Sequence, residues 1–190
     1  MPAKTSETTS ALFQLKVTLN HSRPAIWRKV LVPSDLSFAK LHLVLQSVMG
    51  WENCHMHQFL VGEKLVGSHD LDAGSDVVNE VRTRLNKLVS GPPETFTYEY
   101  DFGDNWELTV SVEKIREREA GGVYPVCIGG KMAAPPDDSG GIWHYFDMLD
   151  ILKDPAHPEY NECREILGDH FDPKRVDLEE INARLRRRKW

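Results

Sequence analysis

The sequence has few cysteines and no long hydrophobic run. Its three cysteines, Cys54, Cys127 and Cys163, are far apart, and none belongs to a Cys-x-x-Cys pair. An odd number of widely spaced cysteines does not indicate a disulfide framework or a structural zinc site. No apolar stretch approaches the roughly 18 to 20 residues of a membrane span, and the polar residues 1–10 do not resemble a signal peptide. We therefore expect a soluble, cytoplasmic protein that does not enter a membrane.

Basic residues are in the minority. The chain has 23 Lys and Arg against 29 Asp and Glu, for a formal net charge of -6. Because nucleic-acid binding depends mainly on Lys and Arg at the phosphates, this balance disfavours independent binding to nucleic acid. The exception is the basic end at residues 184–189, which is followed by Trp190. It could contact phosphates or an acidic partner, or it is simply the solvated end of a helix, where cations suit the helix dipole.

The length and the 41% hydrophobic content of the chain are suited to one domain with one core. We expect a disordered lead at residues 1–10, a single α+β domain at residues 11–183, and the basic C-terminal end at residues 184–190. No internal repeat is visible, which argues against solenoids and propellers.

Hydrophobic periodicity predicts the main elements. Alternation of apolar and polar residues predicts strands near residues 11–19, 25–32, 56–61, 95–101 and 106–115. Helical spacing predicts a helix over residues 38–49, with Ser37 as N-cap and Gly50 after its end, and a short helix near Leu85. Residues 142–188 are predicted to be helical, with Gly168 ending one of the helices. The expected fold is therefore α+β, an antiparallel β-sheet with helices packed on it and a helical C-terminal region.

Two loops display more acidic residues than their geometry requires. The turn at residues 101–106 reads Asp-Phe-Gly-Asp-Asn-Trp, and a hairpin needs neither two aspartates nor a tryptophan. Residues 119–141 show no periodicity and are predicted to be one long loop, which contains Pro135-Pro136-Asp137-Asp138. If the two loops meet, their carboxylates could hold Mg²⁺, Mn²⁺ or Ca²⁺.

A purely structural interpretation of the same residues stays open. Asp101 would form an Asx turn, Gly103 would supply a positive φ, and Asp138 or Ser139 would cap the following helix. His55 and His57 share one side of a strand, but no third metal ligand is evident near them in the sequence. Buried or surface histidines without a metal are the favoured interpretation of that pair.

Four segments, in order, resemble those of a known family. RPAIWRKVLVP, LHLVLQSVMGWENCHMHQF, FTYEYDFGDNWEL and PPDDSGG are similar to motifs of the plasmid pRiA4b ORF-3-like family, also called insertion-sequence passenger or TnpR-like proteins. The resemblance covers about residues 11–180. It implies an α+β domain built on an antiparallel sheet, found on plasmids and mobile elements and in bacterial and archaeal genomes. It implies no particular biochemical activity.

The chain departs from the family pattern at three positions. The proline loop of the family usually reads Pro-Pro-Glu-Asp-Cys-Gly-Gly, whereas this chain has Asp137 and Ser139 at the Glu and Cys positions. A cysteine nucleophile or thiolate ligand is thus missing at that point. The histidine that often follows Trp-Glu in the hairpin is Leu108 here. The absence of the cysteine and of the histidine reduces the support for a metalloenzyme.

Our first functional hypothesis is a binding or accessory module. The 101–106 hairpin and the 135–141 loop would form a paired rim that holds a protein partner or a small-molecule ligand. Aromatic side chains would supply contact area and carboxylates would fix orientation. The candidate binding residues are Trp51, His57, Tyr100, Asp101, Asp104, Trp106, Asp137, Asp138, Gly140 and Gly141. The sequence identifies no cofactor.

The alternative is a divalent-metal-dependent hydrolase that acts on phosphate esters. Asp101, Asp104, Asp137 and Asp138 would hold the ion, and His57 or His144 would act as the base. Whether the protein is an enzyme is left open by the sequence.

Overall fold

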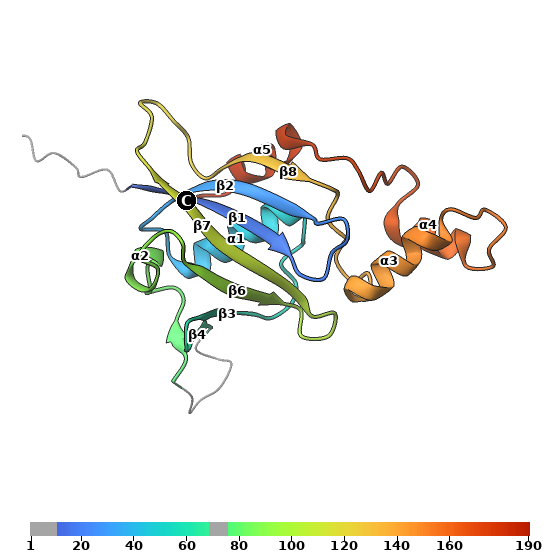
Figure 1. Ribbon diagram of the computed structural model, residues 1–190, viewed down its shortest axis with the longest axis horizontal. Coiled ribbons are helices and arrows are strands. Elements are labelled where there is room, and N and C mark those ends of the chain that lie inside the picture. The colour runs from blue at the N-terminus through green and yellow to red at the C-terminus, as the bar shows by residue number, and fades with distance from the viewer. Residues whose placement is uncertain (1–10, 69–75) are drawn as a thin grey trace, which may run out of the picture.

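The structure is a computed structural model that describes residues 11–68 and 76–190 (Figure 1). The predicted disordered lead at residues 1–10 lies outside the described residues. Within the described residues, eight strands form one sheet in the order β5-β4-β3-β6-β7-β1-β2-β8. All neighbouring strands are antiparallel except β4 and β5. The predicted α+β fold on an antiparallel sheet is confirmed.

The centre of the sheet consists of the strands that the sequence predicted. They are β1 (Leu12–Leu19), β2 (Trp27–Pro33), β6 (Thr95–Tyr100) and β7 (Trp106–Arg116). Their apolar residues alternate toward one face, as in Leu15, Val17 and Leu19, which are at most 2% exposed. The opposite face is polar and carries the ion pair between Lys29 and Glu113, with 3.0 Å between Nζ and Oε2. The sheet therefore buries one face and leaves the other to solvent.

Helix α1 (Phe38–Met49) packs on the apolar face (Figure 1). Ser37 Oγ accepts a hydrogen bond from the Lys40 N–H at 3.3 Å, and Gly50 ends the helix with a φ of 84°. Both helix signals predicted from the sequence are present. Phe38, Leu41 and Leu45 are fully buried, so one stripe of the helix forms the core with the sheet.

The remaining strands extend the sheet on both sides. Strand β3 (His57–Val61) was predicted, whereas β4 (Lys64–Gly67) and the two-residue β5 (Val78–Asn79) were not. The short helix α2 (Leu85–Leu88) lies where the sequence predicted it. Strand β8 (Val126–Lys131) corrects the prediction that residues 119–141 are all loop. The glycines in Val-Cys-Ile-Gly-Gly-Lys and a register shift against β2 between Lys29 and Val30 hide its alternation.

Three helices occupy the described C-terminal region, as predicted: α3 (Gly141–Ile151), α4 (Tyr160–Leu167) and α5 (Leu178–Arg186). Gly168 ends α4, and the Asp177 side chain caps α5 by accepting from the Glu180 N–H at 3.0 Å. Helix α3 contacts α4 beyond one end of the sheet, and α5 contacts both α1 and β8. That residues 11–183 form one domain stays a prediction, which these α5 contacts support.

Helix α5 is joined to the outer side of β8 by one asparagine. The Asn182 carboxamide accepts a hydrogen bond from the Cys127 N–H at 2.8 Å and donates one to the Cys127 carbonyl oxygen at 2.9 Å.

None of the described helices has both the length and the apolar composition that crossing a membrane requires.

Candidate functional site

The turn between β6 and β7 is held by hydrogen bonds of Asp101. Its carboxylate oxygen Oδ1 accepts from the Gly103 N–H at 2.9 Å, which is the expected Asx turn, and its carbonyl oxygen accepts from the Asn105 N–H at 2.6 Å. The positive φ angles in the turn belong to Asp101 (55°) and Asn105 (54°). The expectation that Gly103 supplies the positive φ is therefore wrong, because short Asp and Asn side chains also tolerate the left-handed region.

The structure brings this turn against the proline loop. The Gly140 N–H donates to Asp104 Oδ2 at 2.9 Å. Gly141 has a φ of +81°, and a Cβ at that position would lie 2.7 Å from the Asp104 carbonyl oxygen. The two backbones thus approach so closely that only glycine is accommodated. Gly140 is the N-cap residue of α3 and forms no side-chain cap, so neither Asp138 nor Ser139 has the capping role considered above.

The proline loop is also fixed to the segment between α1 and β3. Asp137 Oδ2 accepts from the Glu52 N–H at 2.7 Å and from the Tyr100 hydroxyl at 3.0 Å. The Trp51 indole N–H donates to the Pro135 carbonyl oxygen at 3.1 Å. Burial is the main cause of a raised pKa for Tyr100, so its hydroxyl stays protonated and donates to Asp137. Three separate segments therefore form one junction.

Three predicted site aromatics are part of the core and not of the surface. Trp51 is 4% exposed, and Tyr100 and Trp106 are 0% exposed. The Trp51 ring lies 5.2 Å from the Tyr100 ring and 5.9 Å from the Trp106 ring, centroid to centroid. Their proposed role as ligand contact area is therefore wrong. They stack behind the junction and support the loops. Burial of these large rings removes much apolar surface from water, which stabilises the fold.

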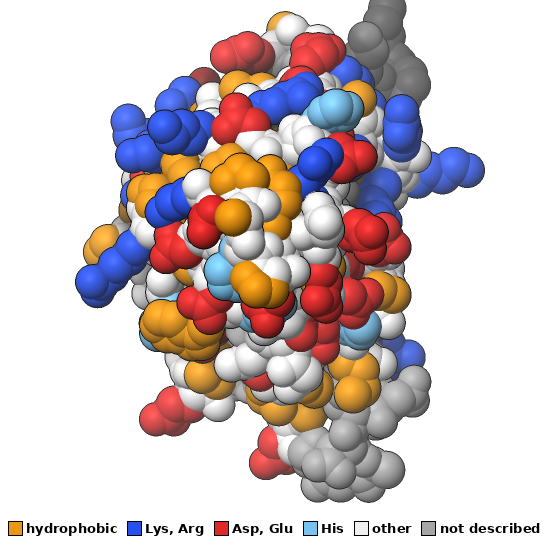
Figure 2. Space-filling model, turned by 90° about the vertical axis from the view of Figure 1, so that its right-hand side faces the viewer, with side chains coloured by type: hydrophobic (Ala, Val, Ile, Leu, Met, Phe, Trp, Pro, Cys, Tyr) orange, Lys and Arg blue, Asp and Glu red, His pale blue; other side chains and the backbone are white. Residues whose placement is uncertain are grey.

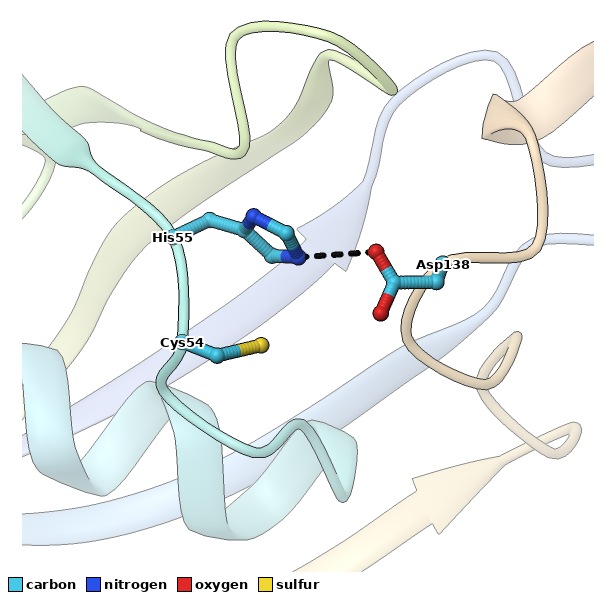
Figure 3. Close-up of side chains that lie close together, drawn as sticks. All are labelled: Cys54, His55 and Asp138. Carbon is cyan, nitrogen blue, oxygen red and sulfur yellow. Dashed lines mark hydrogen bonds and ion pairs between the residues drawn. The ribbon is translucent and has the colours of Figure 1, made fainter.

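An exposed cluster lies in front of these aromatics. The side chains of Cys54 and His55 point from the segment before β3 toward Asp138 of the proline loop (Figure 3). His55 Nε2 lies 2.8 Å from Asp138 Oδ1 and 3.7 Å from Asp101 Oδ2. One ligand atom each from Cys54, His55 and Asp138 lies within 4.8 Å of the others. These three residues are the group in the described chain that could hold a metal ion.

The carboxylates around His55 change its proton affinity. Desolvation opposes the charged imidazolium, but the attraction of Asp101 and the hydrogen bond to Asp138 outweigh it, so the pKa of His55 is raised. The junction is thus a place of negative potential that favours a cation.

The two histidines proposed as bases lie in different surroundings. His57 Nε2 is 2.8 Å from Glu80 Oε2, and its ring stacks on His42 with 3.5 Å between centroids. This pairing removes His57 from the junction site. His144 is exposed on the first turn of α3, beside Gly140.

Hydrophobic side chains near the junction are exposed to solvent. Met56 is 58% exposed, Phe102 is 41% exposed, and Trp143 is 69% exposed. They flank His55, Asp101 and the start of α3 in the sequence. Figure 2 shows the face toward which the 101–105 turn and α3 project in Figure 1, and acidic and histidine side chains are interspersed there with hydrophobic ones. This face is mixed in character and not a smooth charged surface.

The sequence-based site omitted Cys54 and His55. The signal that could have found them is strand pairing. Strands β3 and β6 are antiparallel with His57 opposite Tyr100, and the Asp101 N–H donates to the Met56 carbonyl oxygen at 2.9 Å. Residues just before β3 therefore lie beside residues just after β6. Both strands were predicted, but their pairing was not.

Comparison with known proteins agrees with the motifs. The sequence pattern of "Plasmid pRiA4b ORF-3-like protein" matches residues 11–180 of the chain. This chain belongs to the plasmid pRiA4b ORF-3-like family. A relative in the family, "Uncharacterized protein y4hQ" of Sinorhizobium fredii (strain NBRC 101917 / NGR234), is 33% identical over 175 residues, which cover 91% of this chain and 90% of the relative.

A solved structure has the same fold as this pRiA4b ORF-3-like protein. It is the "Crystal Structure of Protein of Unknown Function MM3350 from Methanosarcina mazei Go1", with 39% identity and a TM-score of 0.83, over 91% of this chain and 98% of that chain. Neither relative's description names an activity, so the function must be inferred from the site.

The structure also explains two departures from the family motifs. Ser139, where the family usually has Cys, is 1% exposed, and its hydroxyl donates to the Pro136 carbonyl oxygen at 2.7 Å. It braces the proline loop from inside. Leu108, where a histidine is frequent, is fully buried in the core. In this pRiA4b ORF-3-like protein, neither side chain is available to a ligand.

Proposed function

We propose that the protein is a binding module, and that its binding face is the junction of the 101–106 turn, the proline loop and the segment before β3. The ligand is a protein partner or small molecule that presents a positively charged group beside an apolar one. The setting suggested by the family name is that of an accessory protein of plasmids or mobile elements.

The observation that carries this proposal is that the four aspartates of the junction differ in their contacts and exposure. Asp101, Asp104 and Asp137 accept hydrogen bonds that fix the loops, whereas Asp138 has a side chain that is 69% exposed and faces His55. A face held by buried aromatics and internal hydrogen bonds does not need to be ordered when a ligand binds. Such preorganisation lowers the entropic penalty of association.

Charge and exposure suggest the character of the ligand. The carboxylates of Asp101 and Asp138 lie 3.7 Å and 2.8 Å from His55 Nε2, and negative groups placed so close together suit a positively charged ligand. Phe102 and Trp143 are exposed nearby, and aromatic side chains of this kind anchor many interfaces. A partner segment that combines Arg or Lys with an apolar residue is complementary to both features.

NMR titration of ¹⁵N-labelled protein tests the proposal. Short peptides that pair Arg or Lys with an aromatic residue are expected to shift the amide signals of residues 52–56, 101–105 and 138–143. Peptides with Glu in place of Arg are expected to leave them unchanged. Asp138→Asn should weaken binding, while Asp169→Asn should not, although the two side chains are similarly exposed at 69% and 71%. Shifts that map elsewhere would contradict the proposal.

The hydrolase alternative has less support from the contacts. The convergence of the acidic loops favours it, but Asp101, Asp104 and Asp137 already accept hydrogen bonds, and His57 is paired with Glu80. A test with p-nitrophenyl phosphate and its bis ester in the presence of Mg²⁺, Mn²⁺ or Ca²⁺ separates the two functions. Turnover that disappears in Asp104→Asn and Asp138→Asn would favour the hydrolase over the binding module.

A further inference from the structure

We propose that Cys54, His55 and Asp138 form a binding site for a divalent transition-metal ion of the Zn²⁺ type. The inference rests on the proposed function only because it uses the same binding face. The ion would bind to this face even when no protein or small-molecule ligand is present. Its ligands differ from the four aspartates that the sequence suggested for a metal ion.

The geometry brings three different ligand atoms to one point. The ligand atoms of Cys54, His55 and Asp138 all lie within 4.8 Å of one another. In a tetrahedral zinc site with bonds of about 2.0 to 2.3 Å, ligand atoms are separated by roughly 3.3 to 3.8 Å. Small side-chain rotations on an exposed surface cover that difference. His55 Nε2 and Asp138 Oδ1, which are now 2.8 Å apart in a hydrogen bond, would move apart slightly and both bind the ion.

The chemistry of the ligands selects the metal. A thiolate, an imidazole and a carboxylate together are characteristic of Zn²⁺ and related transition metals, whereas Mg²⁺ and Ca²⁺ take oxygen ligands. The only exposed cysteine among the described residues is Cys54, while Cys127 and Cys163 are buried. When its thiolate binds the ion, the thiol proton passes to solvent.

An independent observation concerns Asp137. Its Oδ1 atom is buried and has no hydrogen-bond partner among the described residues, which is costly for a carboxylate oxygen. Its Oδ2 atom lies 3.8 Å from Cys54 Sγ and accepts from the Tyr100 hydroxyl. A buried Oδ1 atom without a partner in the described part of the chain, on the carboxylate that lies next to the thiol, is explained if a cation at the site balances its charge. Asp137 would then act as an outer partner of the ligands.

The ligands are held by the elements that shape the junction. The Cys54 N–H donates to the Tyr100 hydroxyl at 3.2 Å, which fixes the start of the Cys-His pair. Asp138 follows Asp137, whose carboxylate is anchored by Glu52 and Tyr100. Three protein ligands on an open surface leave one coordination position free, as in zinc sites that bind a further molecule. A partner of the binding face would occupy that position.

Cobalt substitution tests the site. Tag-free protein is titrated with Co²⁺, followed by Zn²⁺ in competition, and the thiolate-to-cobalt absorption is recorded. One equivalent of Co²⁺ should bind with this absorption, and Zn²⁺ should displace it while Mg²⁺ does not. Cys54→Ser should abolish the band, and His55→Gln and Asp138→Asn should each weaken binding at least tenfold.

Matched controls make the outcome decisive. His170→Gln and Asp169→Asn remove exposed side chains of the same types outside the cluster, and both should bind Co²⁺ like the wild type. Binding without a thiolate band, or equal binding by the cluster and control variants, would overturn the site. So would binding of Mg²⁺ in preference to Zn²⁺.

Metal binding and peptide binding can each fail independently, and the two experiments tell these outcomes apart. If Arg-containing peptides bind the face in the presence of a chelator and no transition metal binds, the binding module stands and the metal site falls. If Zn²⁺ binds at Cys54 and no peptide shifts the junction signals with or without Zn²⁺, the metal site stands and the proposed ligand is wrong.

Discussion

The carboxylate of Asp104 accepts a hydrogen bond from the backbone N–H of Gly140 at 2.9 Å, across 36 positions of sequence. This contact closes the junction between the β6–β7 turn and the proline loop. Asp104 is half-buried, whereas Asp138 in the same junction is exposed. The two aspartates therefore differ in their surroundings: Asp104 holds the two loops together, and Asp138 presents its carboxylate to solvent beside His55.

The first prediction separates these two aspartates. Asp104→Ala leaves the Gly140 N–H without its partner and should lower the free energy of unfolding by about 1 to 2 kcal/mol. Asp138→Asn keeps the backbone bonds of the loop and should change it by less than about 0.5 kcal/mol. Urea denaturation of both variants measures the difference. Equal losses would show that both side chains are architectural.

The second prediction concerns Gly141. Alanine there adds a Cβ 2.7 Å from the Asp104 carbonyl oxygen at a φ of +81°, so both a steric clash and an unfavourable backbone region result. We expect a loss of more than about 2 kcal/mol in the free energy of unfolding. Gly62→Ala is the control, because Gly62 also has a positive φ of +59° but no atom within 4 Å of the added Cβ. That variant should lose only about 1 kcal/mol, and a similar loss in both would exclude the close approach.

The third prediction concerns the buried Arg28. Its guanidinium donates to the carbonyl oxygens of Val48 at 3.2 Å and Met132 at 2.8 Å, and burial lowers its pKa to about 10. Arg28→Met leaves buried carbonyls unpaired and should cost on the order of 3 kcal/mol of stability. Arg28→Lys should also destabilise, because an ammonium does not reproduce the planar fork. The exposed Arg82→Met serves as control and should stay within about 0.5 kcal/mol. Thermal and urea melts provide the measurement.

The fourth prediction concerns pH. Burial is the main cause, and the neighbouring His57 a further one, of a pKa for His42 that is lowered to about 3. Since the unfolded pKa is about 6.5, the unfolded state takes up the proton first, and stability is lost as the pH falls from about 6.5 toward 3. Between pH 7 and pH 5 His42 alone should remove about 2 kcal/mol.

His42→Gln tests this pH dependence, because glutamine does not titrate. The variant is less stable at pH 7, where the hydrogen bonds of His42 to Tyr98 and Asn53 are altered. Its loss of stability between pH 7 and pH 5 should nevertheless be smaller than that of the wild type. His55, whose pKa is raised, contributes with the opposite sign in both proteins and cancels in the comparison. An unchanged slope would mean that folding does not lower the pKa of His42.

The fold was predictable where local signals and burial agree. The strands that became β1, β6 and β7 alternate because one side of each is buried, and α1 carries both an N-cap serine and a terminal glycine. Strand β8 was not predicted because it pairs on one side only and contains Gly129 and Gly130. Its conformation is determined by pairing with β2 and not by its own pattern.

The site was predictable only in outline. The hypothesis that the turn and the proline loop meet depended on acidic, aromatic and proline residues that neither loop needs for its own geometry. The structure brings these loops together through Asp104 and Gly140. Burial of Trp51, Tyr100 and Trp106 was not predictable, because an aromatic residue suits a core and a binding face equally well. The contact of His55 with Asp138 depends on strand register and loop docking, which are tertiary properties.

The pairing of the Asn182 side chain with the backbone of Cys127 has a consequence for self-association. An outermost strand offers free N–H and C=O groups on which a strand of another molecule can add, and this is a common start of aggregation. Within the described residues β8 is the outermost strand on one side, and the carboxamide of Asn182 occupies both groups at its second residue. The opposite side ends in β5, which at two residues is too short to template a ladder. Both edges of the described sheet therefore offer fewer free backbone groups to a second molecule than a long, uncovered edge strand would.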